Sequence, residues 1–96
     1  HLVKRYDAAK TNGTVVAGGN GPGADLNQLY LPLDVAVDRD YSVYVCDRAN
    51  GRIMKWPRGA KEGVIFADRG TIAHPEGIFI DSLGTLYATD GSGKIL

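Results

Sequence analysis

One internal repeat constrains the fold of this chain more than any other feature. Residues 32–47 align without a gap with residues 75–90, at an offset of 43 residues. Four positions are identical in the two copies, namely Pro32/Pro75, Asp38/Asp81, Tyr44/Tyr87 and Asp47/Asp90. A repeat of roughly 20 to 50 residues is typical of solenoids and propellers. The sequence therefore predicts an array of similar units.

Weaker similarities extend the repeat on both sides of these segments. Residues 52–55 resemble residues 1–4 and 94–96, and residues 63–67 resemble residues 13–17. Each unit then contains four short apolar stretches that are rich in Val, Ile and Tyr and bounded by Gly, Asp, Asn or Pro. Such stretches are typical of β-strands. No stretch keeps a period of about 3.6 residues, so we predict essentially no helix.

The short connections between these stretches predict their topology. Gaps of a few residues join neighbouring antiparallel strands, so each unit should be a four-stranded meander. Such a meander, repeated, is the blade of a β-propeller. We predict an all-β chain that is part of one propeller domain, with residues 1–17 ending one blade, 32–67 forming a full blade and 75–96 starting the next.

The residues of the repeat resemble those of the NHL family over the whole chain. The pattern runs from a proline before Val-x-Val-Asp, through Tyr-x-x-Asp, to an Asn-Gly-Arg-Ile turn and a Lys-Trp end. The resemblance implies a propeller of six blades when complete. Asp34 and Tyr41 depart from it, because glycine is usual there and the second copy has Gly77 and Gly84. We expect distorted turns at these two residues.

Two blades cannot close a ring, and an open array would expose apolar faces and unpaired strand edges. We therefore expect either a fragment of a longer chain, completed by the remaining blades, or copies that close as a homotrimer.

Composition narrows the classes of partner. The chain has 11 Lys and Arg against 11 Asp and Glu. This neutrality argues against nucleic acid, which is bound by an excess of basic residues. No apolar run reaches the roughly 18 to 20 residues of a membrane span. Cys46 is the single cysteine and is interpreted as a buried thiol, so no internal disulfide is predicted.

The polar residues of the repeat are predicted to be structural. Asp47 and Asp90 end second strands, and Asp38 and Asp81 end first strands, where a carboxylate accepts backbone N–H bonds in a turn. We predict no catalytic residue, metal ligand or cofactor within this chain. The resemblance to propeller enzymes leaves calcium on the axis of the complete ring as an alternative.

Trp56 and Tyr44 are predicted to fill the space between blades. His1 and His74 are assigned no zinc-binding or catalytic role, since no second histidine lies at ligand spacing.

The segment Gly18–Gly23 lacks the spacing of a phosphate-binding loop and reads as a flexible link between blades. The rim formed by this link and the turn after the second strand is a common binding face in propellers. The predicted partner-contacting residues are Asp25, Gln28, Tyr30, Arg48 and Asn50.

Asn12-Gly13-Thr14 is an acceptor triplet for N-glycosylation, which makes Asn12 a candidate site and favours an extracellular or cell-surface protein. The leading functional hypothesis is a non-enzymatic scaffold that binds proteins. The alternative is a metal-dependent lyase or lactonase-like propeller enzyme. RNA binding, which some NHL domains of tripartite-motif proteins carry out, ranks third.

Overall fold

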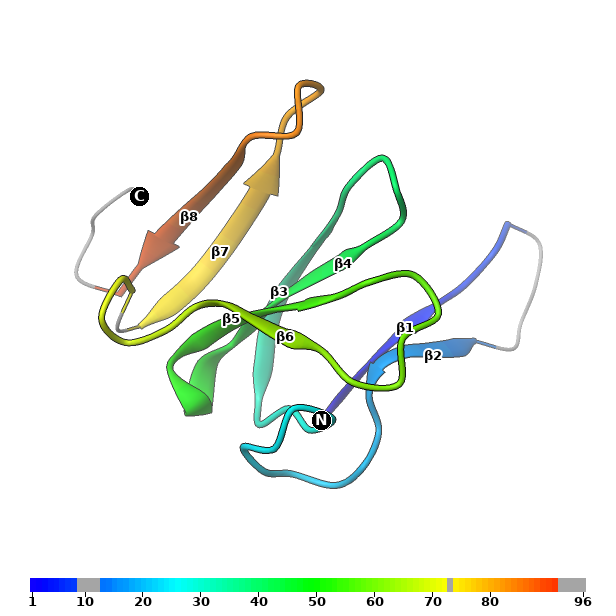
Figure 1. The fold of residues 1–96 in the computed structure, drawn as a ribbon, viewed down its shortest axis with the longest axis horizontal. Helices are drawn as coiled ribbons and strands as arrows, with labels where there is room; N and C mark the ends of the chain where they lie inside the picture. Colours follow the sequence, from blue (N-terminus) through cyan, green and yellow to red (C-terminus); the bar gives the residue numbers. More distant parts are fainter. Residues whose placement is uncertain (9–12, 73, 92–96) are drawn as a thin grey trace.

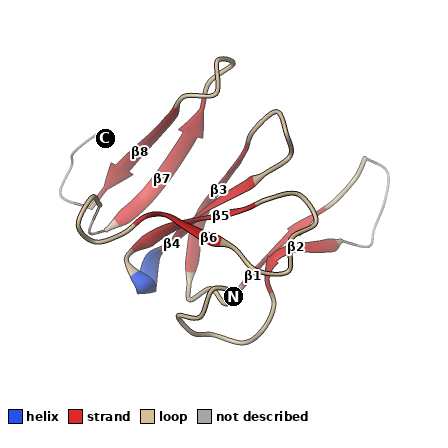
Figure 2. Ribbon diagram, viewed as in Figure 1, coloured by secondary structure: helices blue, strands red, loops and turns tan. Residues whose placement is uncertain are grey.

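A computed structural model describes residues 1–8, 13–72 and 74–91. The described residues form three antiparallel sheets, which confirms the all-β prediction (Figures 1 and 2). The strands are β1 (Leu2–Arg5), β2 (Thr14–Gly18), β3 (Pro32–Val37), β4 (Val43–Asp47), β5 (Arg52–Trp56), β6 (Val64–Ala67), β7 (Pro75–Ile80) and β8 (Leu86–Asp90). Among the described residues, helix is limited to the single 3-10 turn η1 (Arg48–Asn50).

The four central strands pair in chain order, β3-β4-β5-β6, as a propeller blade requires. The β1–β2 and β7–β8 hairpins lie on either side of this sheet (Figure 1). The hairpins correspond in sequence to the third and fourth strands of one blade and to the first and second strands of another. Assignment of residues 1–17, 32–67 and 75–96 to one propeller domain stays a prediction.

The sequence repeat is also a repeat of backbone irregularity. Pro32 pairs with Asp47 and Asp34 with Cys46, so one residue of β3 bulges out between them. Pro75 and Gly77 pair with Asp90 and Thr89 and leave the same bulge in β7. A bulge bends the strand and increases its twist, so β3 and β7 begin with the same bend.

The two turns that follow β3 and β7 correct one expectation. Tyr41 adopts the left-handed conformation with φ 62°, as Gly84 does with φ 85°. Each donates its backbone N–H to the carbonyl of the preceding aspartate, Asp38 or Asp81, over 3.1 Å. The predicted distortion at Tyr41 is therefore wrong. The turn keeps its shape, and the tyrosine bears a conformational cost of about 1–2 kcal/mol.

Two apolar clusters lie on opposite faces of the central sheet. The first fills the space beside the β1–β2 hairpin and contains Ala17, Leu29, Val43, Val45, Met54 and Trp56. The second lies toward the β7–β8 hairpin and contains Ile53, Ile72 and Ala88. Because successive residues of a strand point to opposite faces, β5 serves both clusters. The prediction that Trp56 fills the space between blades is confirmed.

Candidate functional site

The most buried polar group of the described chain is an ion pair at the end of β4. Arg52 Nε donates to Asp47 Oδ2 over 2.8 Å, and the two side chains are 7% and 0% exposed. Asp47 also accepts from the Tyr30 N–H and from Asn50 Nδ2. Unpaired buried charges are costly, and this carboxylate is fully hydrogen-bonded. The structural role predicted for Asp47 is confirmed.

Arg52 also holds the link between β2 and β3. Its guanidinium donates to the backbone carbonyls of Ala24, Asp25 and Gln28 over 2.9–3.1 Å. Asn50 Nδ2 adds a bond to the carbonyl of Gly23 over 2.8 Å. The sequence does not reveal this use of Arg52, because its partners are backbone atoms that are separated from it by more than 20 residues.

The link itself is more ordered than the glycine content indicated. Gln28 Oε1 accepts from the Asp25 N–H, and Gln28 Nε2 donates to the carbonyl of Asn20. Leu29 is fully buried beneath the loop and pairs with Pro22 through an isolated bridge. The expected flexible link is instead a loop held by side-chain bonds and one apolar anchor.

Three of the five predicted partner-contacting residues lie exposed on this loop and on η1. They are Asp25, Tyr30 and Arg48, and we call them the rim residues. The Ala49 N–H donates to the carbonyl of Tyr30 over 3.1 Å, which joins η1 to the loop. The other two, Gln28 and Asn50, are half-buried, and their polar atoms make the internal bonds described above.

The opposite end of the blade carries the two aspartate-tyrosine turns. Asp38 accepts from the N–H groups of Asp40 and Ser42 and from the Tyr44 hydroxyl. Asp81 accepts in the same way from Leu83, Thr85 and Tyr87. The turn-capping role predicted for both aspartates is confirmed.

These contacts shift the pKa values of Asp38, Tyr44 and Asp81. Burial alone would raise the pKa of Asp38, but the hydrogen bonds from Ser42, Tyr44 and Asp40 and the charge of Lys55 hold it below its ordinary value. Burial and the bond to Asp38 raise the pKa of Tyr44. The bond from the Thr85 N–H is the main cause that lowers the pKa of Asp81.

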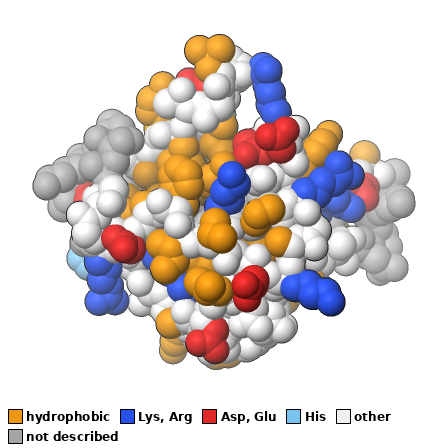
Figure 3. Space-filling view, in the orientation of Figure 1, with side chains coloured by type: hydrophobic (Ala, Val, Ile, Leu, Met, Phe, Trp, Pro, Cys, Tyr) orange, Lys and Arg blue, Asp and Glu red, His pale blue; other side chains and the backbone are white. Residues whose placement is uncertain are grey.

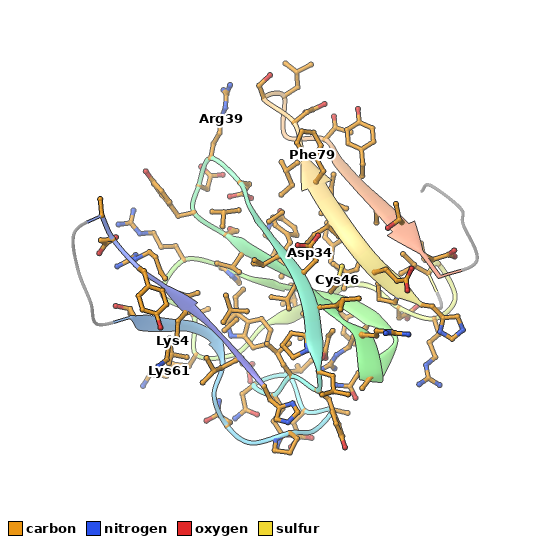
Figure 4. The ribbon with its side chains drawn as sticks, turned by 180° about the vertical axis from the view of Figure 1, so that it is seen from behind. Lys4, Asp34, Arg39, Cys46, Lys61 and Phe79 are labelled. Carbon is orange, nitrogen blue, oxygen red and sulfur yellow. The ribbon has the colours of Figure 1, made fainter. Side chains whose placement is uncertain are left out.

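Cys46 lies on β4 behind Asp34, facing the β7–β8 hairpin (Figure 4). The thiol is fully buried, as predicted, and burial followed by the charge of Asp34 raises its pKa to about 12. A neutral buried thiol is inert as a nucleophile. Asp34 itself bridges two strands, because its two oxygens accept from the N–H groups of Val35 and Ile78.

The described residues contain no group of three or more His, Cys, Asp or Glu side chains placed to hold a metal ion. They also contain no helix of the length and hydropathy needed to cross a membrane. His74 is exposed. The glycosylation candidate Asn12 lies outside the described residues.

One protein-family model matches part of the chain. Residues 62–96 match the model of the N-terminal region of strictosidine synthase-like proteins. The match covers little more than a third of the chain and includes β6, β7 and β8. No curated protein matches the chain. These findings are consistent with a propeller-like fold, and they leave the NHL resemblance as a prediction.

Proposed function

We propose that this chain is part of a β-propeller that serves as a non-enzymatic protein-binding scaffold, with the rim residues Asp25, Tyr30 and Arg48 as its partner-contacting surface. The supporting observation is the ion pair of Asp47 and Arg52. Both side chains also form hydrogen bonds with backbone atoms of the loop that carries Asp25 and Tyr30.

A loop held in this way can bind with little ordering cost. Association loses free energy for each side chain or loop that must be immobilised, and a preorganised surface avoids part of that loss. Tyr30 is half-exposed and makes an edge-on ring contact with His1 at 5.2 Å between centroids. Tyrosine and arginine, two of the three rim residues, are side chains enriched in binding hot spots.

The test uses a photo-crosslinking amino acid placed at Tyr30 in one variant and at Leu83 in a matched control. Leu83 is 88% exposed and lies in the turn between β7 and β8, at the opposite end of the blade. A partner protein should be crosslinked only at position 30. The purified partner should then bind the chain at least about tenfold more weakly when Asp25, Tyr30 and Arg48 are changed to Ala. Equal capture at both positions, or unchanged affinity, would overturn the proposal.

A propeller enzyme with a bound metal is the second candidate, favoured by the match to strictosidine synthase-like proteins, a family that includes enzymes. Metal analysis of the intact protein separates the two candidates. A stoichiometric ion would support the enzyme, with calcium the first expectation for a ring of carboxylates. Sub-stoichiometric metal together with rim-dependent binding would support the scaffold.

A further inference from the structure

A groove of about 620 Å³ runs between β2 and the turn that joins β5 to β6. Its charged lining consists of Arg5, Arg58 and Lys61, all of them exposed, and no Asp or Glu is among the described residues that line it. Figure 4 shows Lys61 beside the β1–β2 hairpin, although this residue belongs to the β5–β6 turn. We call this site the basic groove. It gathers positive charge on a chain that is neutral overall.

One wall of the basic groove is the backbone edge of β2. All five residues of this strand line the groove, whereas a strand that turned only one face to it would contribute every second residue. Among the described residues, β2 pairs only with β1. Its other edge therefore presents backbone N–H and C=O groups to which a further strand can pair.

The basic groove lies between two sheets that are both described. β2 belongs to the first sheet, and the turn that carries Arg58 and Lys61 belongs to the central one. Residues 13–17 resemble residues 63–67, so β2 corresponds to β6, the last strand of the central sheet. Further strands of the first sheet would pair on the side of β1, and further blades would stack on faces turned away from the groove. The rest of a propeller would therefore leave this groove open.

Tyr41 gives an independent reason to assign a function to the basic groove. Its backbone is left-handed, with φ 62°, at a position where the second copy of the repeat has Gly84. The ring is 61% exposed, and the guanidinium carbon of Arg58 lies 5.1 Å from its centre. This cation–π contact restricts Arg58 beside the groove. Strained backbone gathers at functional sites, and here the strained residue holds one of the three cations.

The charges of the basic groove are available to a ligand. Arg5 Nε lies 3.4 Å from Asp7 Oδ1, but the two side chains are 53% and 51% exposed. An exposed pair of this kind contributes little to stability, so an incoming carboxylate can replace Asp7. Neither Arg58 nor Lys61 forms a salt bridge with another residue in the described ranges.

We propose that the basic groove binds an extended acidic segment of a partner protein. The segment pairs with the free edge of β2, and its carboxylates contact Arg5, Arg58 and Lys61, while Tyr41 is a positioning residue for Arg58. Strand addition takes its affinity from main-chain hydrogen bonds and its specificity from side chains. The proposal goes beyond the proposed function, because none of the rim residues lines this groove.

A nucleic acid fits the basic groove less well than an acidic peptide. It cannot extend the ladder of backbone hydrogen bonds from β2, because it lacks peptide groups. Single-stranded nucleic acids also bind through bases that stack on aromatic side chains. Trp56 is the aromatic residue of the described lining, and it is only 1% exposed.

Fluorescence anisotropy tests the proposal with an eight-residue peptide of alternating glutamate and threonine. Arg58→Gln/Lys61→Gln should weaken binding at least about fivefold, since each exposed charge pair contributes modestly. Arg39→Gln/Arg69→Gln is the matched control, because it removes two exposed arginines outside the groove and should keep the wild-type affinity.

Three results would overturn the proposal. They are a peptide that shows no saturable binding, equal losses in the two double variants, and equal affinity for a peptide of alternating glutamine and threonine. Stronger binding of an eight-nucleotide thymidine strand than of the acidic peptide would assign the groove to nucleic acid instead.

Peptides that are N-methylated at alternate residues test the pairing with β2. The N–H groups that a strand offers to one neighbour come from every second residue. Methylation of either the glutamates or the threonines should therefore weaken binding at least about tenfold, and methylation of the other set should have a smaller effect. Equal effects of the two methylated peptides would contradict strand pairing.

Two variants of Tyr41 separate its positioning role from a structural one. Tyr41→Gly removes the ring that holds Arg58 but suits the left-handed backbone. It should weaken peptide binding about two- to fivefold without lowering the melting temperature. Tyr41→Phe keeps the ring and should bind like the wild type. Unchanged binding in Tyr41→Gly, or an equal loss in Tyr41→Phe, would contradict the assigned role.

Discussion

The central sheet and the β7–β8 hairpin carry the same sequence pattern but differ in how deeply they bury it. Every residue of β4 is buried, whereas β8 alternates between buried and more exposed positions. Tyr44 is 7% exposed and its equivalent Tyr87 is 43% exposed, although both hydroxyls bond to an aspartate. The repeat therefore determines local geometry, while burial depends on whether both faces of a blade are covered.

The same comparison explains one of the two departures from the repeat, Asp34. Asp34 reaches forward to the N–H of Ile78 while also satisfying that of Val35. A Cβ added at its equivalent Gly77 would lie 3.2 Å from Thr89 Oγ1 and, at 3.6 Å, in ordinary contact with Asp34 Oδ2. A residue that breaks the pattern in one unit thus ties that unit to the next.

The largest effect is expected from the buried ion pair. Arg52→Ala should destabilise the chain by about 3–5 kcal/mol, because it leaves the Asp47 carboxylate buried without its cation and frees the loop. Urea unfolding measures the loss. Arg48→Ala removes an exposed arginine close by in the chain and should cost less than about 0.5 kcal/mol. Similar losses in the two variants would show that the ion pair does not anchor the loop.

The next effect contrasts the apolar packing of the two regions. Met54→Ala should cost about 2–5 kcal/mol, because Met54 is fully buried in the central sheet. Leu86→Ala should cost about half as much or less, since Leu86 is only half-buried. Thermal unfolding at matched concentration gives both values. Equal losses would mean that the hairpin is covered as fully as the sheet.

Removing the tyrosine hydroxyls sharpens the comparison further. Tyr44→Phe should cost about 1 kcal/mol, since it deprives a half-buried aspartate of a charge-assisted bond. Tyr87→Phe should cost less, because water replaces the lost donor at an exposed site. Chemical unfolding of the two variants beside the wild type measures the difference. A larger loss for Tyr87→Phe would reverse the assigned order of burial.

The smallest effect is a dependence on pH. The pKa of Asp38 is lower in the folded chain than in the unfolded one. Its contribution is therefore present above the unfolded value near 4 and is lost as pH falls through the folded value. Asp38→Asn should flatten the fall in stability between about pH 5 and pH 2. Acid titration followed by circular dichroism checks this, with Asp40→Asn as a neighbouring control that should keep the wild-type slope.

Figure 3 shows apolar side chains exposed on the side that bears β6, where Val64, Ile65 and Phe66 are each about half-exposed. This short apolar stretch predicted a strand, but the stretch could not show that the outer surface of the strand stays open. Likewise, the sequence predicted the aspartates as turn caps from their place at strand ends, yet it did not reveal that Arg52 would hold the distant loop.

The sequence alone determined the strands, their order and the aspartates that cap the turns, because these depend on short apolar stretches, short connections and bonds between residues close in the chain. Only the tertiary structure decided which copy of the repeat is buried, where Arg52 and Asp34 find their partners, and which faces remain open. Those features depend on contacts between distant segments, and a local pattern does not encode which neighbour covers it.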